Sequence, residues 1–254
     1  MNNTGKVFIC GAGPGDVSLL TLRARDLLIN CNIILYDRLV NDDILSLASS
    51  KSEKIYVGRQ AGDPTINQHL TNRLMVKYAR DGQSVLRLKG GDPFIFGRGA
   101  EEAEYLASKK IKFEIIPGIS SFIGASIYSG IPLTHRKYSS SLAIVTGHEL
   151  LDKHESAVNW KVLHKAADTL VILMGFKNLA NIIGKLINNG MNRKTRVAVI
   201  TNATLKNQEV IMGTLDNILT KTLNKGLRYP SIIIIGKVVK VRNKIKWFEE
   251  LSRI

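Results

Sequence analysis

The segment LKGGDPFIFGRG at residues 88–99 constrains this chain more than any other stretch of its sequence. It follows a short apolar run at Ser84–Leu88 and precedes a helix-like acidic run at Ala100–Lys110. Two adjacent glycines let the backbone approach a ligand that any Cβ would block, and Asp92 and Arg98 add opposite charges to the same loop. The segment therefore predicts a strand, a tight turn and a helix entry that face a small molecule.

A second glycine-rich loop follows the first strand-like run. The apolar residues Val7–Cys10 lead directly into GAGPGD at Gly11–Asp16. In α/β proteins, loops that bind small molecules cluster at the carboxyl ends of the strands. The two loops together predict one small-molecule site at that edge of a sheet.

Strand-like and helix-like runs alternate, which is typical of α/β proteins with mainly parallel sheets. In the first half we expect strands at Lys6–Cys10, Ile33–Tyr36, Lys54–Val57, Ser84–Leu88 and Phe113–Ile116, and helices at Ser18–Asn30, Asn41–Ala48, Ile66–Asp81 and Gly99–Lys110. Thr65 and Gln68 form a capping-box pattern at the start of the third helix.

Pro117 and Gly118 interrupt this pattern, and a second α/β set follows. Ser120 is placed to cap a helix at Ser121–Tyr128 that ends at Gly130. Further strands are expected at Leu142–Thr146, Thr169–Met174, Arg196–Thr201, Glu209–Gly213 and Ser231–Gly236, with a hairpin near Ala203–Gln208 that makes this sheet mixed. We predict two α/β domains, residues 1–117 and 118–254, with the active site in the cleft between them.

The charge balance of the chain is strongly basic. Lys and Arg number 36 against 21 Asp and Glu, so the formal net charge is +15. This excess suits a polyanionic partner, but a solvated basic surface is the simpler explanation. The basic residues are scattered and few aromatics are interleaved with them, so we expect no nucleic-acid partner.

Composition bounds the class further. A chain of 254 residues suffices for one large or two ordinary domains. Apolar runs such as Ser231–Ile235 are too short to span a bilayer, and the first residues lead into a strand without a signal peptide, so we expect a cytoplasmic protein with no membrane partner. Cys10 and Cys31 have no metal-ligand or disulfide-framework spacing, which predicts two core residues.

Neither loop fits a phosphate-binding motif. Counted from Gly11, the sixth position of the dinucleotide fingerprint is Asp16 instead of glycine, and an acid there would repel a pyrophosphate. Pro14 removes a backbone donor, and residues 88–99 lack the order of a P-loop. A ligand recognised through an amine, a ribose and an adenine edge suits these loops better.

Together these segments resemble the tetrapyrrole (corrin and porphyrin) methylases. The resemblance is carried by GAGPGD (Gly11–Asp16), LLTLRA (Leu19–Ala24), LYDRLV (Leu35–Val40), LKGGDPFIFGRGAEE (Leu88–Glu102), PGISS (Pro117–Ser121), SGIPLTHR (Ser129–Arg136), VTGHE (Val145–Glu149) and LMG (Leu173–Gly175). GAGPGD marks the wider superfamily, whereas GGDPFIFGRG together with PLTHR is much more specific.

The resemblance implies S-adenosylmethionine as methyl donor and a homodimer. The paired glycine loops without a metal-ligand cluster predict that no metal is bound. It implies methylation of uroporphyrinogen III at C2 and then C7 to give precorrin-2, which leads to sirohaem, cobalamin and haem d1. The alternative is a methylase of a later precorrin. Because the family pattern begins at residue 6, we expect no fused dehydrogenase or chelatase segment.

The resemblance also assigns site residues. Positions that line the methyl-donor site match Pro14, Gly90, Gly91, Asp92, Ile95, Ser120, Ser121, Met174 and Ala203. Positions assigned to catalysis match Asp37, Arg98 and Glu101, and positions assigned to substrate binding match Arg59, Arg98 and Arg136. Arginine suits a substrate rich in carboxylates, because its planar fork binds them bidentately.

Several of these residues also have plainer structural explanations. These are an ion pair of Arg98 with Glu101 or Glu102, a turn cap at Asp92, a cap or an ion pair with Arg38 at Asp37, and a core position for Met174. His135 and His148 have no partner at metal-ligand spacing, so we predict that neither binds a metal.

The sequence departs from the family pattern at two positions. Arg59 stands where many relatives have lysine, and arginine does not readily release a proton, so we predict a carboxylate clamp there. Ala203 stands where many relatives have glycine, and alanine fits that position provided its φ is negative.

Overall fold

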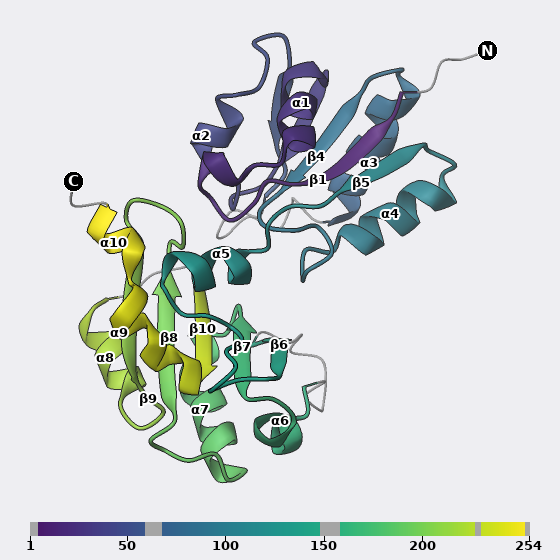
Figure 1. The fold of residues 1–254 in the computed structure, drawn as a ribbon. Helices are drawn as coiled ribbons and strands as arrows, with labels where there is room; N and C mark the ends of the chain where they lie inside the picture. The colour runs from purple at the N-terminus through teal and green to yellow at the C-terminus, as the bar shows by residue number, and fades with distance from the viewer. Residues whose placement is uncertain (1–4, 59–67, 148–157, 227–229, 252–254) are drawn as a thin grey trace. The chain divides into compact units, whose positions relative to one another are not determined.

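The structure is a computed structural model and describes residues 5–58, 68–147, 158–226 and 230–251. It divides into two compact units, Met1–Ser121 and Phe122–Ile254, each built on one five-stranded sheet with helices on its faces (Figure 1). The predicted α/β class is confirmed. The boundary between residues 117 and 118, and a site in a cleft between the domains, stay predictions.

The first unit is a parallel sheet covered on both faces. Its strands are β1 (Val7–Gly11), β2 (Ile33–Tyr36), β3 (Glu53–Tyr56), β4 (Val85–Lys89) and β5 (Phe113–Ile116). They lie in the order β3-β2-β4-β1-β5, and every neighbouring pair is parallel. All five strands therefore end at the same edge of the sheet, where the glycine-rich loops begin.

The helices of this unit are η1 (Val17–Leu19), α1 (Leu22–Asn30), α2 (Asp42–Leu45), α3 (Gln68–Arg80) and α4 (Gly99–Ser108). As Figure 1 shows, α1 and α2 cover one face of the sheet and α3 and α4 the other. Leu28 and Ile44 are fully buried on the first face, and Met75 and Leu106 on the second.

The prediction of one helix at Ser18–Asn30 is wrong, because two separate helices, η1 and α1, occupy this stretch. The Asp16 carboxylate accepts a hydrogen bond from Ser18 N at 2.8 Å and begins η1. The Thr21 hydroxyl accepts one from Ala24 N at 3.2 Å and begins α1. Each cap satisfies a free helix-start donor, so two caps in close succession start two helices. Helix α2 is also shorter than predicted, and Thr65 lies outside the described residues.

Both cysteines lie buried in the cluster beneath α1, as predicted. Burial raises the pKa of the Cys10 thiol to about 12 and that of the Cys31 thiol to about 11. The thiolate is the reactive form of cysteine, and burial removes both the thiolate and access to it.

We therefore expect neither thiol of the native protein to react with iodoacetamide at mildly alkaline pH, whereas both should react in denaturant. Mass spectrometry of the intact chain counts the adducts. Rapid labelling of the native protein would show that the cluster beneath α1 is open to solvent.

The second unit is a mixed sheet. Its strands are β6 (Leu142–Thr146), β7 (Thr169–Leu173), β8 (Arg196–Thr201), β9 (Glu209–Thr214) and β10 (Ser231–Gly236), in the order β6-β7-β10-β8-β9. Only β6 and β7 pair in parallel; β10 is antiparallel to β7 and β8, and β8 to β9. The hairpin and the mixed sheet predicted for this half are confirmed.

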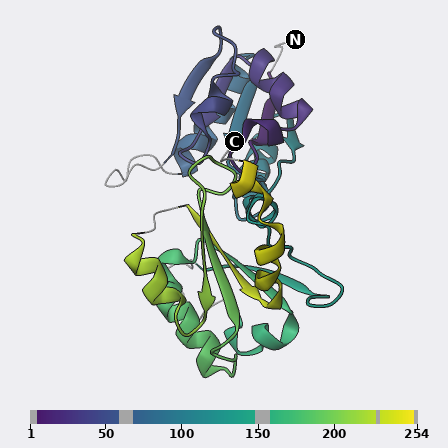
Figure 2. The same cartoon turned by 60° about the vertical axis from the view of Figure 1, so that its left-hand side comes forward.

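The helices of the second unit are α5 (Ser121–Tyr128), α6 (Trp160–Ala166), η2 (Phe176–Asn178), α7 (Leu179–Asn188), α8 (Ile218–Asn224), η3 (Lys237–Val241), α9 (Arg242–Ile245) and α10 (Trp247–Leu251). Helices α6, α7 and α8 pack on one face of the sheet, and α5 and η3 pack on the other. Figure 2 shows α8 and the yellow α9 and α10 on opposite sides of the strands. Within the described part of the chain, no helix has the length and hydropathy that crossing a bilayer needs.

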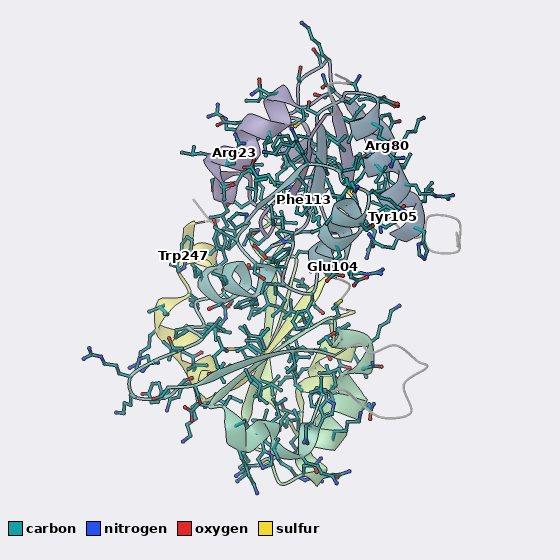
Figure 3. The ribbon with its side chains drawn as sticks, turned by 90° about the vertical axis from the view of Figure 1, so that its right-hand side faces the viewer. Arg23, Arg80, Glu104, Tyr105, Phe113 and Trp247 are labelled. Carbon is teal, nitrogen blue, oxygen red and sulfur yellow. The ribbon has the colours of Figure 1, made fainter. Side chains whose placement is uncertain are left out.

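Contacts of two side chains, Trp247 and Arg242, hold the C-terminal helices in place. Trp247, labelled in Figure 3, donates a hydrogen bond to the Ile127 carbonyl at 2.9 Å and meets the Tyr128 ring edge-on at 5.2 Å between centroids. The buried Arg242 side chain donates to the Ser129 carbonyl and pairs with Glu249. These contacts fix α9 and α10 against α5 and the loop that follows it.

Candidate active site

The two glycine-rich loops meet at the carboxyl edge of the first sheet. Gly91 N donates to Gly13 O at 2.7 Å, and Gly13 N donates to Gly91 O at 3.2 Å. Ala12 N donates to Lys89 O at 2.7 Å. The loops that follow β1 and β4 therefore lie together, as their positions after two strands predict.

The loop that follows β5 closes this junction. A Cβ added to Gly11 would lie 2.5 Å from Gly91 O and 2.7 Å from Gly118 Cα. Gly91 has φ +70° and lies against the backbone of Ser120 and Ser121. The space beside Gly11 is therefore filled by the backbone of the neighbouring loops. We call these three loops, residues 11–16, 90–92 and 117–121, the loop junction.

Asp92 fastens the loop after β4 to the loop after β5. Its Oδ1 accepts a hydrogen bond from Phe94 N at 2.9 Å, which is the turn cap expected as the plainer explanation. Its Oδ2 accepts one from Gly118 N at 3.1 Å, which the sequence did not indicate. Asp92 thus holds the shape of the loop junction, and its contact with a methyl donor stays a prediction.

Beyond Asp92 the chain exposes apolar side chains. Phe94, Ile95 and Phe96 are 54, 38 and 45 % exposed. Phe96 and Arg98 have φ of 52° and 60°, in the left-handed region that residues other than glycine rarely adopt. Backbone strain of this kind clusters at ligand sites, so the segment suits contact with an apolar ligand.

Arg98 and Glu101 form the ion pair named above as the structural alternative. Arg98 Nε donates to Glu101 Oε1 at 3.1 Å and Nη2 donates to Oε2 at 2.6 Å, so the pair is bidentate. The hydrogen bond from Arg98 holds the pKa of the Glu101 carboxyl below its usual range. Both side chains are about half exposed, at 49 and 55 %, so a substrate carboxylate can still reach the arginine.

We expect Arg98→Lys to lower turnover about 10-fold while leaving methyl-donor affinity nearly unchanged. Lysine keeps the charge but loses the fork, and a hydrogen bond to a charged group contributes roughly 1.5 kcal/mol or more. Steady-state kinetics and calorimetry measure the two quantities separately. A lysine variant that turns over at the wild-type rate would show that Arg98 serves only its pair with Glu101.

Behind the loop junction lies a buried charged cluster that the sequence analysis missed. Arg87 and Lys89 on β4 and Glu102 on α4 are 5, 4 and 0 % exposed. Glu102 Oε1 accepts from Arg87 Nε at 3.2 Å and from Lys89 Nζ at 2.9 Å. The available signal was a pair of cations two residues apart in an otherwise apolar strand, because such residues share one face.

The same cluster reaches Asp37 at the end of β2. Asp37 Oδ2 accepts from Arg87 Nη2 at 3.1 Å, and Oδ1 accepts from Leu39 N at 3.1 Å. The second bond is the cap expected for this position. The ion pair is made with Arg87, so the expected pair with Arg38 is wrong.

Three assigned residues lie in the second unit. Arg136 is exposed in a tight turn closed by mutual hydrogen bonds of His135 and Ser139 at 2.9 Å, and it makes no ion pair with any described residue. Met174 follows β7, is 50 % exposed and has φ 56°, so a core position for it is wrong. The φ of Ala203 is not positive, so its backbone meets the condition under which alanine can replace the usual glycine.

The remaining assigned residues divide between the loop junction and the undescribed segments. Pro14, Gly90, Ser120 and Ser121 all belong to the loop junction. Arg59 and His148 lie outside the described residues. In the part of the chain that is described, no cluster of three or more His, Cys, Asp and Glu side chains suits a metal ion.

Comparison with known proteins identifies the family to which the chain belongs. Residues 6–219 match the family described as Tetrapyrrole (Corrin/Porphyrin) Methylases. The chain is 46 % identical over 245 residues to a uroporphyrinogen-III C-methyltransferase of Bacillus subtilis, which covers 96 % of this chain and 95 % of that protein. It is 43 % identical over 244 residues to a siroheme synthase of Thiobacillus denitrificans, covering 96 % of this chain and 50 % of that protein, so it spans about half of that relative's length.

Solved structures agree with this assignment. A Thermus thermophilus uroporphyrin-III C-methyl transferase in complex with S-adenyl homocysteine superposes with a TM-score of 0.79 at 34 % identity. The match covers 93 % of this chain and 94 % of that one.

Proposed function

We propose that this chain, which belongs to the tetrapyrrole (corrin/porphyrin) methylases, methylates uroporphyrinogen III at C2 and then C7 to give precorrin-2, with S-adenosylmethionine as methyl donor. The observation that carries the proposal is the loop junction, which is followed by the exposed apolar segment Phe94–Phe96 with its strained backbone. The chain is also 46 % identical to a relative named for this reaction. That the chain is a methyltransferase follows from the family itself.

The described residues fit such a donor. Ile95 and Met174 are large apolar side chains at 38 and 50 % exposure, which core packing does not use, and both suit an adenosyl or thioether group. We assign Pro14, Gly90, Gly91, Asp92, Ser120, Ser121 and Ala203 to the same donor site. S-adenosylmethionine held there would supply an electrophilic methyl group to a pyrrole β-carbon of the substrate and would leave as the neutral thioether, S-adenosylhomocysteine.

The protein's own groups orient the substrate and handle a proton. The methylated ring is cationic and loses a proton from a neighbouring meso carbon, so an acceptor is needed. We assign Asp37 to this step, because it lies at the carboxyl end of β2 with its side chain 24 % exposed and is held there by the buried Arg87, whereas Glu101 pairs with the exposed Arg98 that we assign to the substrate carboxylates. Arg98 and Arg136 bind substrate carboxylates, and we assign Arg59 to the same role.

We further propose that the enzyme works in the cytoplasm as a homodimer, as the family resemblance implies. Light scattering of the purified protein should give twice the chain mass. A monomer at the enzyme concentrations used in assays would contradict this part of the proposal.

Anaerobic incubation with enzymatically made uroporphyrinogen III and S-adenosylmethionine tests the activity. We expect a product that carries both added methyl groups by mass spectrometry, and none when the donor is omitted. Methylation only of an already methylated precorrin would assign the chain to a later step and overturn the proposed substrate.

A further inference from the structure

We propose that Arg87 and Glu102 are positioning residues for Asp37, so that a buried arginine held by a buried carboxylate orients the side chain that takes up the substrate proton. The inference rests on the proposed function, because it concerns the same reaction. It assigns a role to charged residues that are not part of the donor or substrate sites described above.

The guanidinium of Arg87 is fixed on every side. Its Nε donates to Glu102 Oε1 at 3.2 Å, its Nη2 to Asp37 Oδ2 at 3.1 Å, and its Nη1 to the Leu88 carbonyl at 3.0 Å. Because the guanidinium is planar and its donors form a rigid fork, the contact with Glu102 sets the direction in which Nη2 points. Asp37 thus accepts its hydrogen bond from a guanidinium that contacts with Glu102 and the Leu88 carbonyl hold in place.

The carboxylate of Glu102 is buried and accepts several hydrogen bonds, which fix it as the partner of Arg87. It is fully buried, and its Oε1 also accepts from Lys89 Nζ at 2.9 Å and from Gln68 Nε2 at 2.9 Å. Its Oε2 has no hydrogen-bond partner among the described residues. Buried polar atoms are nearly always paired, and an exception in a native protein calls for a functional or structural explanation.

The charges of the cluster also direct Arg87 to Asp37. Two buried cations, Arg87 and Lys89, both pair with the buried carboxylate of Glu102, and a buried charge without a partner is costly. Asp37 supplies the second anion at the exposed end of the cluster. Burial alone raises the pKa of Glu102, but Arg87 and Lys89 outweigh it and hold that pKa below its ordinary value, so Glu102 remains the charged anchor.

The effect of replacing Arg87 on kcat differs according to whether Arg87 positions Asp37 or only stabilises the fold. If Arg87 acts on turnover through Asp37, its replacement has no further effect once Asp37 can no longer accept a proton. If Arg87 only stabilises the unit, the two losses multiply, since independent effects add in free energy. A double-mutant cycle on turnover therefore separates the two.

The experiment measures kcat and Tm for Asp37→Asn, Arg87→Met and the double variant, with uroporphyrinogen III and S-adenosylmethionine. Loss of a general base lowers kcat roughly 100–10,000-fold, and loss of a hydrogen bond to a charged partner costs about 10–100-fold. We expect Arg87→Met to lower kcat within that second range in the wild-type background and by less than about 3-fold in the Asp37→Asn background. Arg87→Lys, which keeps the charge but cannot contact Asp37 and Glu102 together, replaces Arg87→Met if that variant does not fold.

Arg242→Met is the matched control. Arg242 is a buried arginine that pairs with Glu249 within the second unit, whereas Asp37 belongs to the first. Its replacement should lower Tm, and any change in kcat that it causes should be the same in the wild-type and Asp37→Asn backgrounds. Equal losses from Arg87→Met in the two backgrounds would overturn the positioning proposal. A wild-type enzyme that transfers no methyl group to uroporphyrinogen III would instead refute the proposed function.

Discussion

We expect Gly11→Ala to weaken S-adenosylmethionine binding by at least ~100-fold and to lower the free energy of unfolding by about 1–3 kcal/mol, the usual cost of overpacking. The new Cβ would lie 2.5 Å from Gly91 O and 2.7 Å from Gly118 Cα. Both atoms are backbone, so neither can move aside without separating the loops of the junction. Calorimetry gives the affinity, and urea unfolding gives the stability.

Gly184→Ala is the control for this substitution. Gly184 lies inside α7, and a Cβ there would meet no described atom within 4 Å apart from its chain neighbours and the backbone of its own helix. Alanine should therefore raise stability by roughly 0.5–1 kcal/mol, because glycine loses more backbone entropy in a helix. Donor affinity should not change. If Gly11→Ala binds the donor as tightly as the wild type, the loop junction is not the donor site.

We expect Asp92→Ala to weaken donor binding about 10–100-fold, because each hydrogen bond to a charged group contributes roughly 1.5–3 kcal/mol. The substitution releases Phe94 N and Gly118 N, and with them the link between two loops of the junction. The expected loss holds whether Asp92 contacts the donor or only shapes its site.

Asp168→Ala serves as the matched variant for Asp92. Asp168 also accepts hydrogen bonds from two backbone groups, Ser140 N at 2.8 Å and Ser141 N at 3.2 Å, but it precedes β7, whereas Met174 follows that strand. Its replacement should leave donor affinity unchanged. A dissociation constant that is the same for Asp92→Ala and the wild type would mean that the junction keeps its shape without this carboxylate.

The strands could be predicted almost residue by residue. Every predicted strand end lies within one residue of the observed end, because short β-branched runs bounded by glycine and polar residues have few other solutions. Helix starts were less predictable. The break between η1 and α1 depends on which of several capping side chains, Asp16 or Thr21, captures the free backbone donors.

The sequence by itself determined the α/β class, the mixed second sheet, the family and the glycine-rich loops that follow the strands, because these follow from local patterns and motifs. Only the tertiary structure decided what those loops contact. Asp92 proved to bind Gly118, 26 residues away, and Asp37 proved to bind Arg87, 50 residues away. The buried cluster of Arg87, Lys89 and Glu102 appeared only once α4 packed on β4. Such partners are chosen by the packing of a helix and several strands at one sheet edge, and no pattern local in sequence encodes that choice.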